Sequence, residues 1–386
     1  MNTRTACTPR TRRRRVAPAR TTVAVAVAMS AAALSLASCG VVDGIGDESG
    51  ASPTKGDDIT VGLLLPEKEN ARYEQFDHPI FAKRVAELTG GQGTVEYANA
   101  EGKATTQNRQ LERMVADKVD ILVVDAVDAK GIASGVRKAK DAGIPVIAYD
   151  RLAQGPIDAY ISFDNELVGQ VQGRALVEKL GNSSANKIIM MNGAPTDPNA
   201  AQFKAGAMSE LQDAVEIAKE YDTKDWDPKN AKANMEKAVA AVGLGNIAGV
   251  YAANDGIAGA VIDVLKTTGA SGIPPVTGQD AELAAVRRIV SGDQYMSVYK
   301  SYPQEANAAA EMAVAKVQGR TIEFDALTRD SVDSPTTENV PAQLVSVVAL
   351  TRNNIKDTVV ADGIYTVKQI CTSEYRTACQ EIGLLK

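Results

Sequence analysis

One strand–helix–strand unit decides the fold: ILVVDAVDAKGIASGVRKAKDAGIPVIAYD, residues 121–150. It begins with four consecutive apolar residues, which is typical of a strand buried on both faces. Apolar residues then recur with helical spacing over 132–142. The residues GIPV at 143–146 end this helix and start a second apolar strand at 146–148. Two buried strands joined by a helix indicate parallel pairing and therefore an α/β fold.

The same alternation continues along the chain in both directions. Upstream of the unit, the sequence predicts strands at 59–65 and 95–98 and helices at 79–88 and 105–117. Downstream the pattern restarts, with strands expected at 187–191, near 217, and at 249–252, 275–277 and 295–299, and helices at 202–211, 229–242, 257–266 and 283–289. This order predicts two similar α/β units with parallel sheets. The pattern does not assign the helix at 304–317 or the β-rich 340s to either unit.

Length and composition agree with a globular protein of two domains. The chain has 386 residues, of which 45% are hydrophobic and 23% charged, which excludes disordered, collagen-like and multi-span membrane proteins. A single histidine, His78, argues against zinc hydrolases and Ser-His-Asp triads, because both need imidazoles in specific roles. No Gly-rich phosphate loop is present. We therefore expect no metal site and no cofactor.

The first 38 residues have the composition of a bacterial export signal. They contain seven Arg and no acidic residue, and they end in an apolar, Ala-rich run at 21–38. The following junction, LASCG at 36–40, resembles a lipobox, in which Cys39 becomes the lipidated first residue of the mature protein. An uncleaved membrane anchor and a plain secretory signal remain the alternatives.

Cleavage after residue 38 changes the charge of the protein. Removing seven Arg from the 42 basic residues leaves 35 against 48 acidic ones, a net charge of −13. An acidic surface disfavours binding to nucleic acid. The stretch from Cys39 to residue 57 is rich in Gly, Ser and Asp and predicts a flexible tether. The folded part is therefore expected just outside the cell membrane, held there by a lipid anchor.

Two cysteines remain near the C-terminus, Cys371 and Cys379. An exported protein permits a disulfide between them, and closing so short a loop stabilises the fold by about 2.6 kcal/mol in the chain-entropy model. Two unpaired thiols are the alternative.

Polar side chains follow five of the expected strands. They occur in the segments 149–151, 192–199, 254–256 and 279–280 and at Lys300. Because ligands of open parallel sheets bind at the carboxyl ends of the strands, these residues are candidates for a binding site. Asp and Asn at such positions also cap helices and turns, and Arg and Lys also form surface ion pairs, so position alone does not separate the two uses.

Eight motifs, spread from residue 70 to 359, narrow the interpretation. They are NARY at 70–73, AYDR at 148–151, YISFDN at 160–165, DPNA at 197–200, ND at 254–255, GQD at 278–280, VYK at 298–300 and NNIKDTV at 353–359. In these motifs and their order the chain resembles the periplasmic sugar-binding proteins of ABC transporters, of the D-xylose-binding and multiple-sugar type.

The resemblance implies the type I periplasmic binding protein fold. Two Rossmann-like lobes with parallel sheets would be joined by a hinge of three strands and would close on a pyranose. By motif, the N-terminal lobe would span 58–164 plus 303–337, and the C-terminal lobe 165–302 plus 338–386.

The resemblance also implies a set of ligand-binding residues. Sugar hydroxyls both donate and accept hydrogen bonds, which suits planar or charged groups. Trp226 would stack against the ring, although a lone Trp also packs structurally, and Tyr73 would form the opposite wall, where relatives carry Trp. Lys300 would neutralise the Asp residues, so we expect a roughly charge-balanced cluster. The polar members are Arg72, Asp150, Arg151, Asn199, Asn254, Asp280 and Lys300.

By this resemblance the protein is a lipid-anchored, monomeric receptor and not an enzyme. It would capture a monosaccharide, with D-xylose favoured, and deliver it to the permease subunits of an ABC importer. One alternative is a receptor for several sugars (glucose, galactose, arabinose) with a sensory role. A transcriptional regulator of the same fold would need a basic N-terminal DNA-binding domain. A sugar-modifying enzyme could use Asp150 and Asp280 as acid and base.

Overall fold

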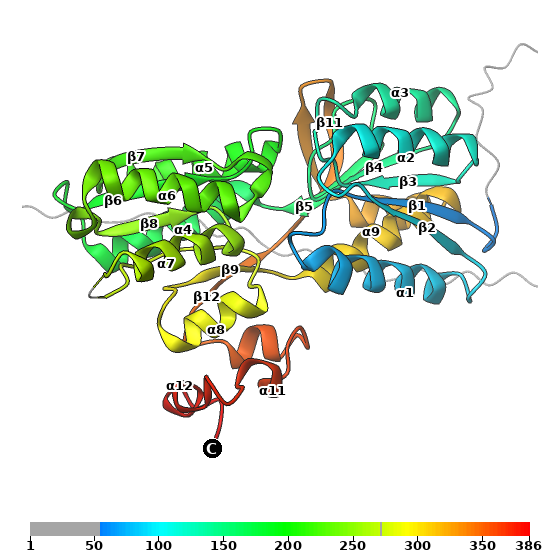
Figure 1. The fold of residues 1–386 in the computed structure, drawn as a ribbon. Coiled ribbons are helices and arrows are strands. Elements are labelled where there is room, and N and C mark those ends of the chain that lie inside the picture. Colours follow the sequence, from blue (N-terminus) through cyan, green and yellow to red (C-terminus); the bar gives the residue numbers. More distant parts are fainter. Residues whose placement is uncertain (1–54, 271) are drawn as a thin grey trace, which may run out of the picture. The chain divides into compact units, whose positions relative to one another are not determined.

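The structure is a computed structural model that describes residues 55–270 and 272–386. The expected signal, the lipidation site Cys39 and almost all of the tether lie outside these ranges. Within them the chain forms two α/β lobes, each built on its own parallel sheet (Figure 1). No helix in the described ranges is long and apolar enough to cross a bilayer.

The first lobe is built on a seven-stranded sheet. All neighbouring strands pair in parallel except β10 and β11, which form an antiparallel hairpin at one edge. In spatial order the strands are β10 (Asp330–Ser334), β11 (Thr337–Val345), β5 (Ala159–Phe163), β4 (Val146–Tyr149), β3 (Ile121–Val124), β1 (Thr60–Leu65) and β2 (Thr94–Asn99).

Helices cover both faces of this sheet, as the uniformly apolar strands require. They are α1 (His78–Leu88), α2 (Ala104–Ala116), α3 (Ala133–Asp141) and α9 (Tyr302–Val317). Successive residues of a strand point to opposite faces. In β3, Ile121 and Val123 pack with α1 and α9, whereas Leu122 and Val124 pack with α2 and α3. The unassigned helix at 304–317 thus belongs to the first lobe.

The second lobe has a three-stranded parallel sheet in the order β7 (Glu216–Asp222), β6 (Lys187–Asn192), β8 (Gly249–Ala252). Its helices are α4 (Asn165–Leu180), α5 (Pro198–Leu211), α6 (Pro228–Val242), α7 (Asp255–Thr267) and α8 (Leu283–Ser291). The strand expected at 275–277 is wrong in extent: Val276 makes a single parallel bridge to Val250. Pro274 and Pro275 have no N–H to donate, which limits a longer ladder there.

The chain passes between the lobes three times. It crosses from β5 to α4, from β9 (Ser297–Lys300) to α9, and from β11 to β12 (Val347–Leu350), which pairs antiparallel with β9. The expected boundary at 337/338 is too early, because β11 stays paired with β5 as far as Val345. Hydrogen bonds between β11 and β5 keep β11 in the first sheet. The boundary between the lobes therefore lies after β11 and not at the turn formed by residues 335–336.

The C-terminal tail packs against α8. It contains α11 (Val367–Ile370) and α12 (Arg376–Glu381), and Cys371 and Cys379 form a disulfide between them. Ile370 and Cys379 are fully buried in the cluster that includes Val286 and Ile289 of α8. The disulfide therefore joins the two helices of the tail, and their packing against α8 holds the tail to the second lobe. A further short helix, α10 (Thr321–Leu327), follows α9.

Candidate functional site

A cavity lies where the carboxyl ends of strands from both lobes meet, the usual ligand position in α/β folds. It measures about 530 Å³, counted with its opening to solvent. The first lobe contributes residues that follow β1 and β4, and the second lobe contributes residues that follow β6 and β8, the loop before α8 and the end of β9. The lining residues are Glu67, Glu69, Asn70, Arg72, Tyr73, Asp150, Arg151, Asp197, Asn199, Phe203, Trp226, Pro228, Asn254, Gly256, Gln279, Asp280, Glu282 and Lys300.

On the first-lobe side, Arg72 is the centre of a buried charge cluster. One guanidinium nitrogen donates to Asp150 Oδ2, while Nε and Nη2 donate to Asp77 at 2.9 and 2.7 Å. Nη2 also donates to Glu305, and the hydroxyl of Tyr149 donates to Asp77. The hydrogen bonds from behind fix the plane of the guanidinium, so its face toward the cavity is oriented before any ligand arrives.

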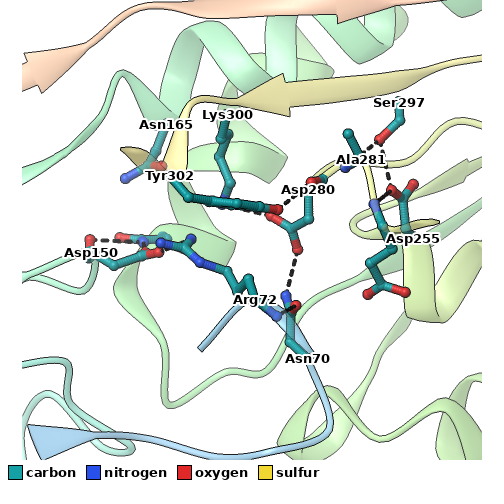
Figure 2. A network of polar contacts seen from close by, with 12 residues as sticks. Asn70, Arg72, Asp150, Asn165, Asp255, Asp280, Ala281, Ser297, Lys300 and Tyr302 are labelled. Carbon is teal, nitrogen blue, oxygen red and sulfur yellow. Dashed lines mark hydrogen bonds and ion pairs between the residues drawn. The ribbon is translucent and has the colours of Figure 1, made fainter. Parts of the chain in front are cut away.

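On the second-lobe side, Asp280 and Lys300 form a buried ion pair with 2.8 Å between Nζ and Oδ1. Oδ2 of Asp280 accepts a hydrogen bond of 2.8 Å from the side-chain amide of Asn70, which belongs to the first lobe (Figure 2). The backbone carbonyl of Asp280 accepts from the hydroxyl of Tyr302. Asp280 therefore contacts both lobes.

An ion pair between the lobes involves Arg151. Its Nε lies 2.9 Å from Asp197 and 3.4 Å from Asp125, and Nη1 donates to the carbonyl of Ala126. Asp197 also accepts from the indole N–H of Trp226 at 3.1 Å. Arg151 thus holds together buried acids of both lobes in addition to lining the cavity.

The two predicted asparagines have different environments. Asn199 donates from its amide to the carbonyl and to Oδ1 of Asp150, at 3.0 and 2.7 Å, and its own Oδ1 is buried without a partner among the described residues. Asn254 accepts from the N–H of Ile257 and caps α7. The capping alternative therefore holds for Asn254, whose side chain nevertheless lines the cavity.

The indole ring of Trp226 packs against the backbone at Gly193, which directly follows β6. A Cβ on Gly193 would lie 2.1 Å from the indole, so only glycine leaves room for the ring. Phe203 meets it edge-on, with 6.4 Å between ring centroids. Tyr73 is buried, also lines the cavity, and its hydroxyl accepts from Arg151 at 3.5 Å.

Three of these residues have backbone in the left-handed region: Asp150, Trp226 and Asp280, with φ of 54°, 57° and 93°. Such conformations are uncommon for residues other than glycine and are frequent at binding sites. The sharp turns they make follow the strand ends and turn the side chains into the cavity.

Burial and the neighbouring charges act in opposite directions on these groups. Burial alone would raise the pKa of Asp150, but Arg72, Lys300 and Arg151 hold it below the usual value. Burial opposes the charge on Lys300, yet Asp280 and Asp150 raise its pKa. Both groups are therefore ionised at neutral pH, which strengthens hydrogen bonds to hydroxyls.

The cavity is not charge-balanced, contrary to the expectation from the sequence. Among the described residues that line it, the acids Glu67, Glu69, Asp150, Asp197, Asp280 and Glu282 face only the cations Arg72, Arg151 and Lys300. The three acids in excess are Glu67, Glu69 and Glu282, none of which stands in the quoted motifs.

All nine residues predicted to bind the ligand line this one cavity. Sequence reasoning missed several others, although some had a signal: Asn70 and Asp197 stand inside the quoted motifs, and Phe203 follows Asn199 by one helical turn. Gly256 and Gln279 also stand in the candidate segments 254–256 and 279–280, whereas Glu67, Glu69, Pro228 and Glu282 had no signal in the sequence.

Comparison with known proteins identifies the family. The model of the periplasmic binding protein domain matches residues 61–321. The chain belongs to the periplasmic binding protein family. This finding confirms the family and the fold class inferred from the sequence.

Relatives of this periplasmic binding protein include sugar-binding periplasmic proteins. The D-xylose-binding periplasmic protein of Escherichia coli is 36% identical over 319 residues, which cover 81% of this chain and 93% of the relative. A multiple sugar-binding periplasmic protein of Azospirillum brasilense is 34% identical, covering 83% and 94%. Among solved structures, an ABC transporter solute-binding protein of Clostridium phytofermentans with bound β-D-glucose has a TM-score of 0.75 at 27% identity, covering 81% of this chain and 99% of that one.

Proposed function

We propose that this periplasmic binding protein captures a monosaccharide between its lobes and delivers it to an ABC importer. The observation that carries the proposal is the arrangement of ionised, oriented groups from both lobes around one cavity: Arg72 with Asp150 on one side, Lys300 with Asp280 on the other. A pyranose hydroxyl both donates and accepts, so a carboxylate next to a cation satisfies it fully.

We favour D-xylose as the ligand, because two D-xylose-binding proteins are 36% and 35% identical to this chain. A receptor for several sugars with a sensory role is the alternative, supported by the relative with 34% identity. A D-xylose receptor and a multiple-sugar receptor differ in the space that the cavity leaves beyond carbon 5 of the bound sugar. At that carbon a hexose carries an extra hydroxymethyl group.

The mechanism would be binding with hinge closure and no chemistry. A ligand that touches both lobes stabilises the closed state by its greater affinity for that state, and the permease would respond to closure. The three crossings between the lobes are the segments that would bend. We further propose that the protein is monomeric and that a lipid on Cys39 and the tether through residue 57 hold it at the outer side of the cell membrane.

The ion pairs weaken the enzyme alternative. A general acid needs a proton at neutral pH, but Arg72, Lys300 and Arg151 keep the pKa of Asp150 low, and Asp280 is paired with Lys300. Incubating the protein with D-xylose and analysing the sugar would test this directly. Conversion of the sugar would contradict the receptor proposal.

Titration calorimetry on the chain starting at Gly40 tests the proposed function. D-xylose, D-glucose, D-galactose, L-arabinose and D-ribose would be compared, with the fluorescence of Trp226, the only tryptophan in the chain, as a second readout. One-to-one binding of D-xylose alone supports a dedicated receptor, and similar affinities for hexoses support the multiple-sugar alternative. No binding of any of the five sugars would refute the proposal.

A further inference from the structure

One acid of the cavity, Asp197, contacts both lobes through a single oxygen atom. Its Oδ2 accepts a hydrogen bond of 3.1 Å from the indole N–H of Trp226, which belongs to the second lobe. The same oxygen lies 2.9 Å from Nε of Arg151, which belongs to the first lobe. Asp197 is only 4% exposed, so water competes little for either contact. One buried oxygen therefore joins an aromatic side chain of the cavity to a cation of the opposite lobe.

The other oxygen of Asp197 fixes the carboxylate to a helix. Asp197 is the N-cap of α5, and its Oδ1 accepts the backbone N–H of Asn199 at 2.9 Å. Pro198 occupies the first turn of α5, where its fixed φ suits the start of a helix. Because Oδ1 satisfies the helix end, Oδ2 is the oxygen left to receive Trp226 and Arg151. The start of α5 thus determines where Oδ2 lies.

Trp226 lies outside regular secondary structure and depends on such contacts for its position. It ends a short turn at 224–226, in which Asp225 and Trp226 both have φ of 57°. Phe203 and the backbone at Gly193 limit the space that the indole can occupy. The indole N–H is a donor only, and among the described residues its acceptor is Asp197. Packing confines the ring, and the bond to Asp197 orients it.

Arg151 reaches Oδ2 from a fixed position in the first lobe. Its Nη1 donates to the carbonyl of Ala126 at 3.1 Å, and its Nε lies 3.4 Å from the fully buried Asp125. Its Nη2 donates to the hydroxyl of Tyr73 at 3.5 Å. The two aromatic side chains expected beside the sugar, Tyr73 and Trp226, are therefore connected through Arg151 and Asp197.

We propose that Asp197 is a positioning residue of the sugar site, which orients Trp226 before the sugar binds and receives Arg151 when the lobes close. Asp197 and Trp226 both belong to the second lobe, so their bond does not need the first lobe. Arg151 belongs to the first lobe, so its contact with Oδ2 forms only when the lobes meet. The inference rests on the proposed sugar-binding function and adds to it a residue that acts through two others.

Asp197→Asn separates this role from the capping of α5. Asparagine is a good N-cap, so its one acceptor oxygen can replace Oδ1. Its amide group then takes the place of Oδ2 and meets the N–H donors of Trp226 and Arg151, with which it forms no hydrogen bond as a donor. Arg151 keeps Asp125 as a counter-charge, which favours a folded variant. Asp197→Ser, which caps with its hydroxyl and has no second oxygen, is a second variant with the same expected effects.

The fluorescence of the protein without sugar reports the environment of Trp226, the only tryptophan in the chain. We expect Asp197→Asn to shift the emission maximum to longer wavelength and to increase quenching by acrylamide, because the ring is no longer held by its N–H. The matched control is Asp227→Asn. Asp227 caps α6 by accepting the N–H of Lys229 at 2.8 Å, so this substitution removes a charge next to Trp226 without removing its acceptor. The control should leave emission and quenching unchanged.

Stopped-flow mixing with the tightest-binding of the five sugars measures the effect on binding. We expect the sugar to leave Asp197→Asn about tenfold faster or more, with an association rate within about threefold of the wild type. The reason is that the contact with Arg151 holds the lobes together after the sugar has entered.

Trp226→Phe tests whether Asp197 acts through the indole. Phenylalanine keeps an aromatic ring but has no N–H to donate. Adding Asp197→Asn to Trp226→Phe should therefore lower sugar affinity less than Asp197→Asn does alone, because the orienting bond is already absent. Titration calorimetry on the wild type, both single variants and the double variant measures this difference.

The outcomes separate this inference from the proposed function. Unchanged emission and quenching in Asp197→Asn, an unchanged rate of sugar release, or losses of affinity that simply add in the double variant would each overturn the inference and leave the receptor function standing. Failure of all five sugars to bind the wild-type protein refutes the proposed function and this inference with it.

Discussion

At the residue scale, the cavity is built from buried charges that satisfy one another. Lys300 and Asp280 are 4% and 3% exposed, and their attraction is effective because water is largely excluded. Removing one member of such a pair leaves the other buried without a partner, which costs more than the loss of a surface contact. The binding site should therefore respond strongly to single substitutions.

Asp280→Asn should weaken sugar binding by about 2–5 kcal/mol, because it leaves the ammonium of Lys300 buried beside a neutral group. Asparagine suits the test, since it keeps the shape and tolerates the positive φ of 93° at this position. Titration calorimetry measures the change. The matched control is Asp293→Asn, which breaks an exposed pair with Lys266 and should leave affinity unchanged. Equal affinities for the two variants would remove Asp280 from the site.

Arg151 is less suitable for such a test, although the sequence gives it the same role as Asp280. Its guanidinium pairs with Asp197 and Asp125, and Asp125 is fully buried. Truncating Arg151 would leave these acids without their cation and would destabilise the fold itself. Sequence motifs could place Arg151 at a strand end, but they could not show that its charge also has a structural role.

The limits of sequence reasoning at this scale have a physical cause. Six of the nine expected residues were predictable because they follow strands whose carboxyl ends meet in a parallel fold, whereas Arg72, Tyr73 and Trp226 were expected only from the family resemblance. Glu67 and Glu282 were not predictable, because they stand outside the quoted motifs and the strand-end segments. A glutamate in such a position has the same sequence pattern as a solvated surface residue.

At the element scale, α4 is the main element that the sequence did not predict. Its apolar stripe is weak because glycines replace large side chains where α4 crosses α5. A Cβ on Gly169 would lie 1.9 Å from the carbonyl oxygen of Phe203, and one on Gly206 would lie 1.9 Å from that of Glu166. The two helices pack backbone to backbone, a contact that hydrophobic periodicity does not reveal.

Gly206→Ala should therefore lower the free energy of unfolding by about 1–3 kcal/mol, because the added methyl group must push the helices apart. Urea denaturation measures the loss. Gly245→Ala is the control, since a Cβ at Gly245 meets no atom within 4 Å and should change stability little. If both variants unfold at the same urea concentration, the helices do not pack as closely as described.

The tail is a second element whose contribution can be measured. Replacing Cys371 and Cys379 by Ala should lower the free energy of unfolding by about 2.6 kcal/mol in the chain-entropy model. Sugar affinity should not change, because neither cysteine lines the cavity. A variant that unfolds like the wild type would show that the disulfide does not stabilise the tail, and a large loss of affinity would show that the tail supports the cavity.

At the scale of the whole molecule, the fold separates strands that are adjacent in sequence and joins strands that are distant. β11 follows β10 in the first sheet, whereas β12, two residues later, pairs with β9 in the second lobe. Periodicity predicted the strands and helices of each lobe well, because they are local. It could not assign the 340s, because pairing with β5 and β9 is set by contacts between remote parts of the chain.

The same topology brings the proposed site together. Residues from 67 to 300 meet in one cavity only because three crossings place the carboxyl ends of both sheets opposite each other. Hinge closure would then depend on bending at these crossings, with the contacts Asn70–Asp280 and Asn199–Asp150 joining the lobes.

The most direct test of the central claim is a crystal structure of the protein grown with saturating D-xylose. The account predicts one pyranose in the cavity, with hydroxyls bonded to Asp150 and Arg72 on one side and to Asp280 and Lys300 on the other, and with Trp226 against the ring. A sugar bound elsewhere, or a cavity without sugar under these conditions, would contradict it.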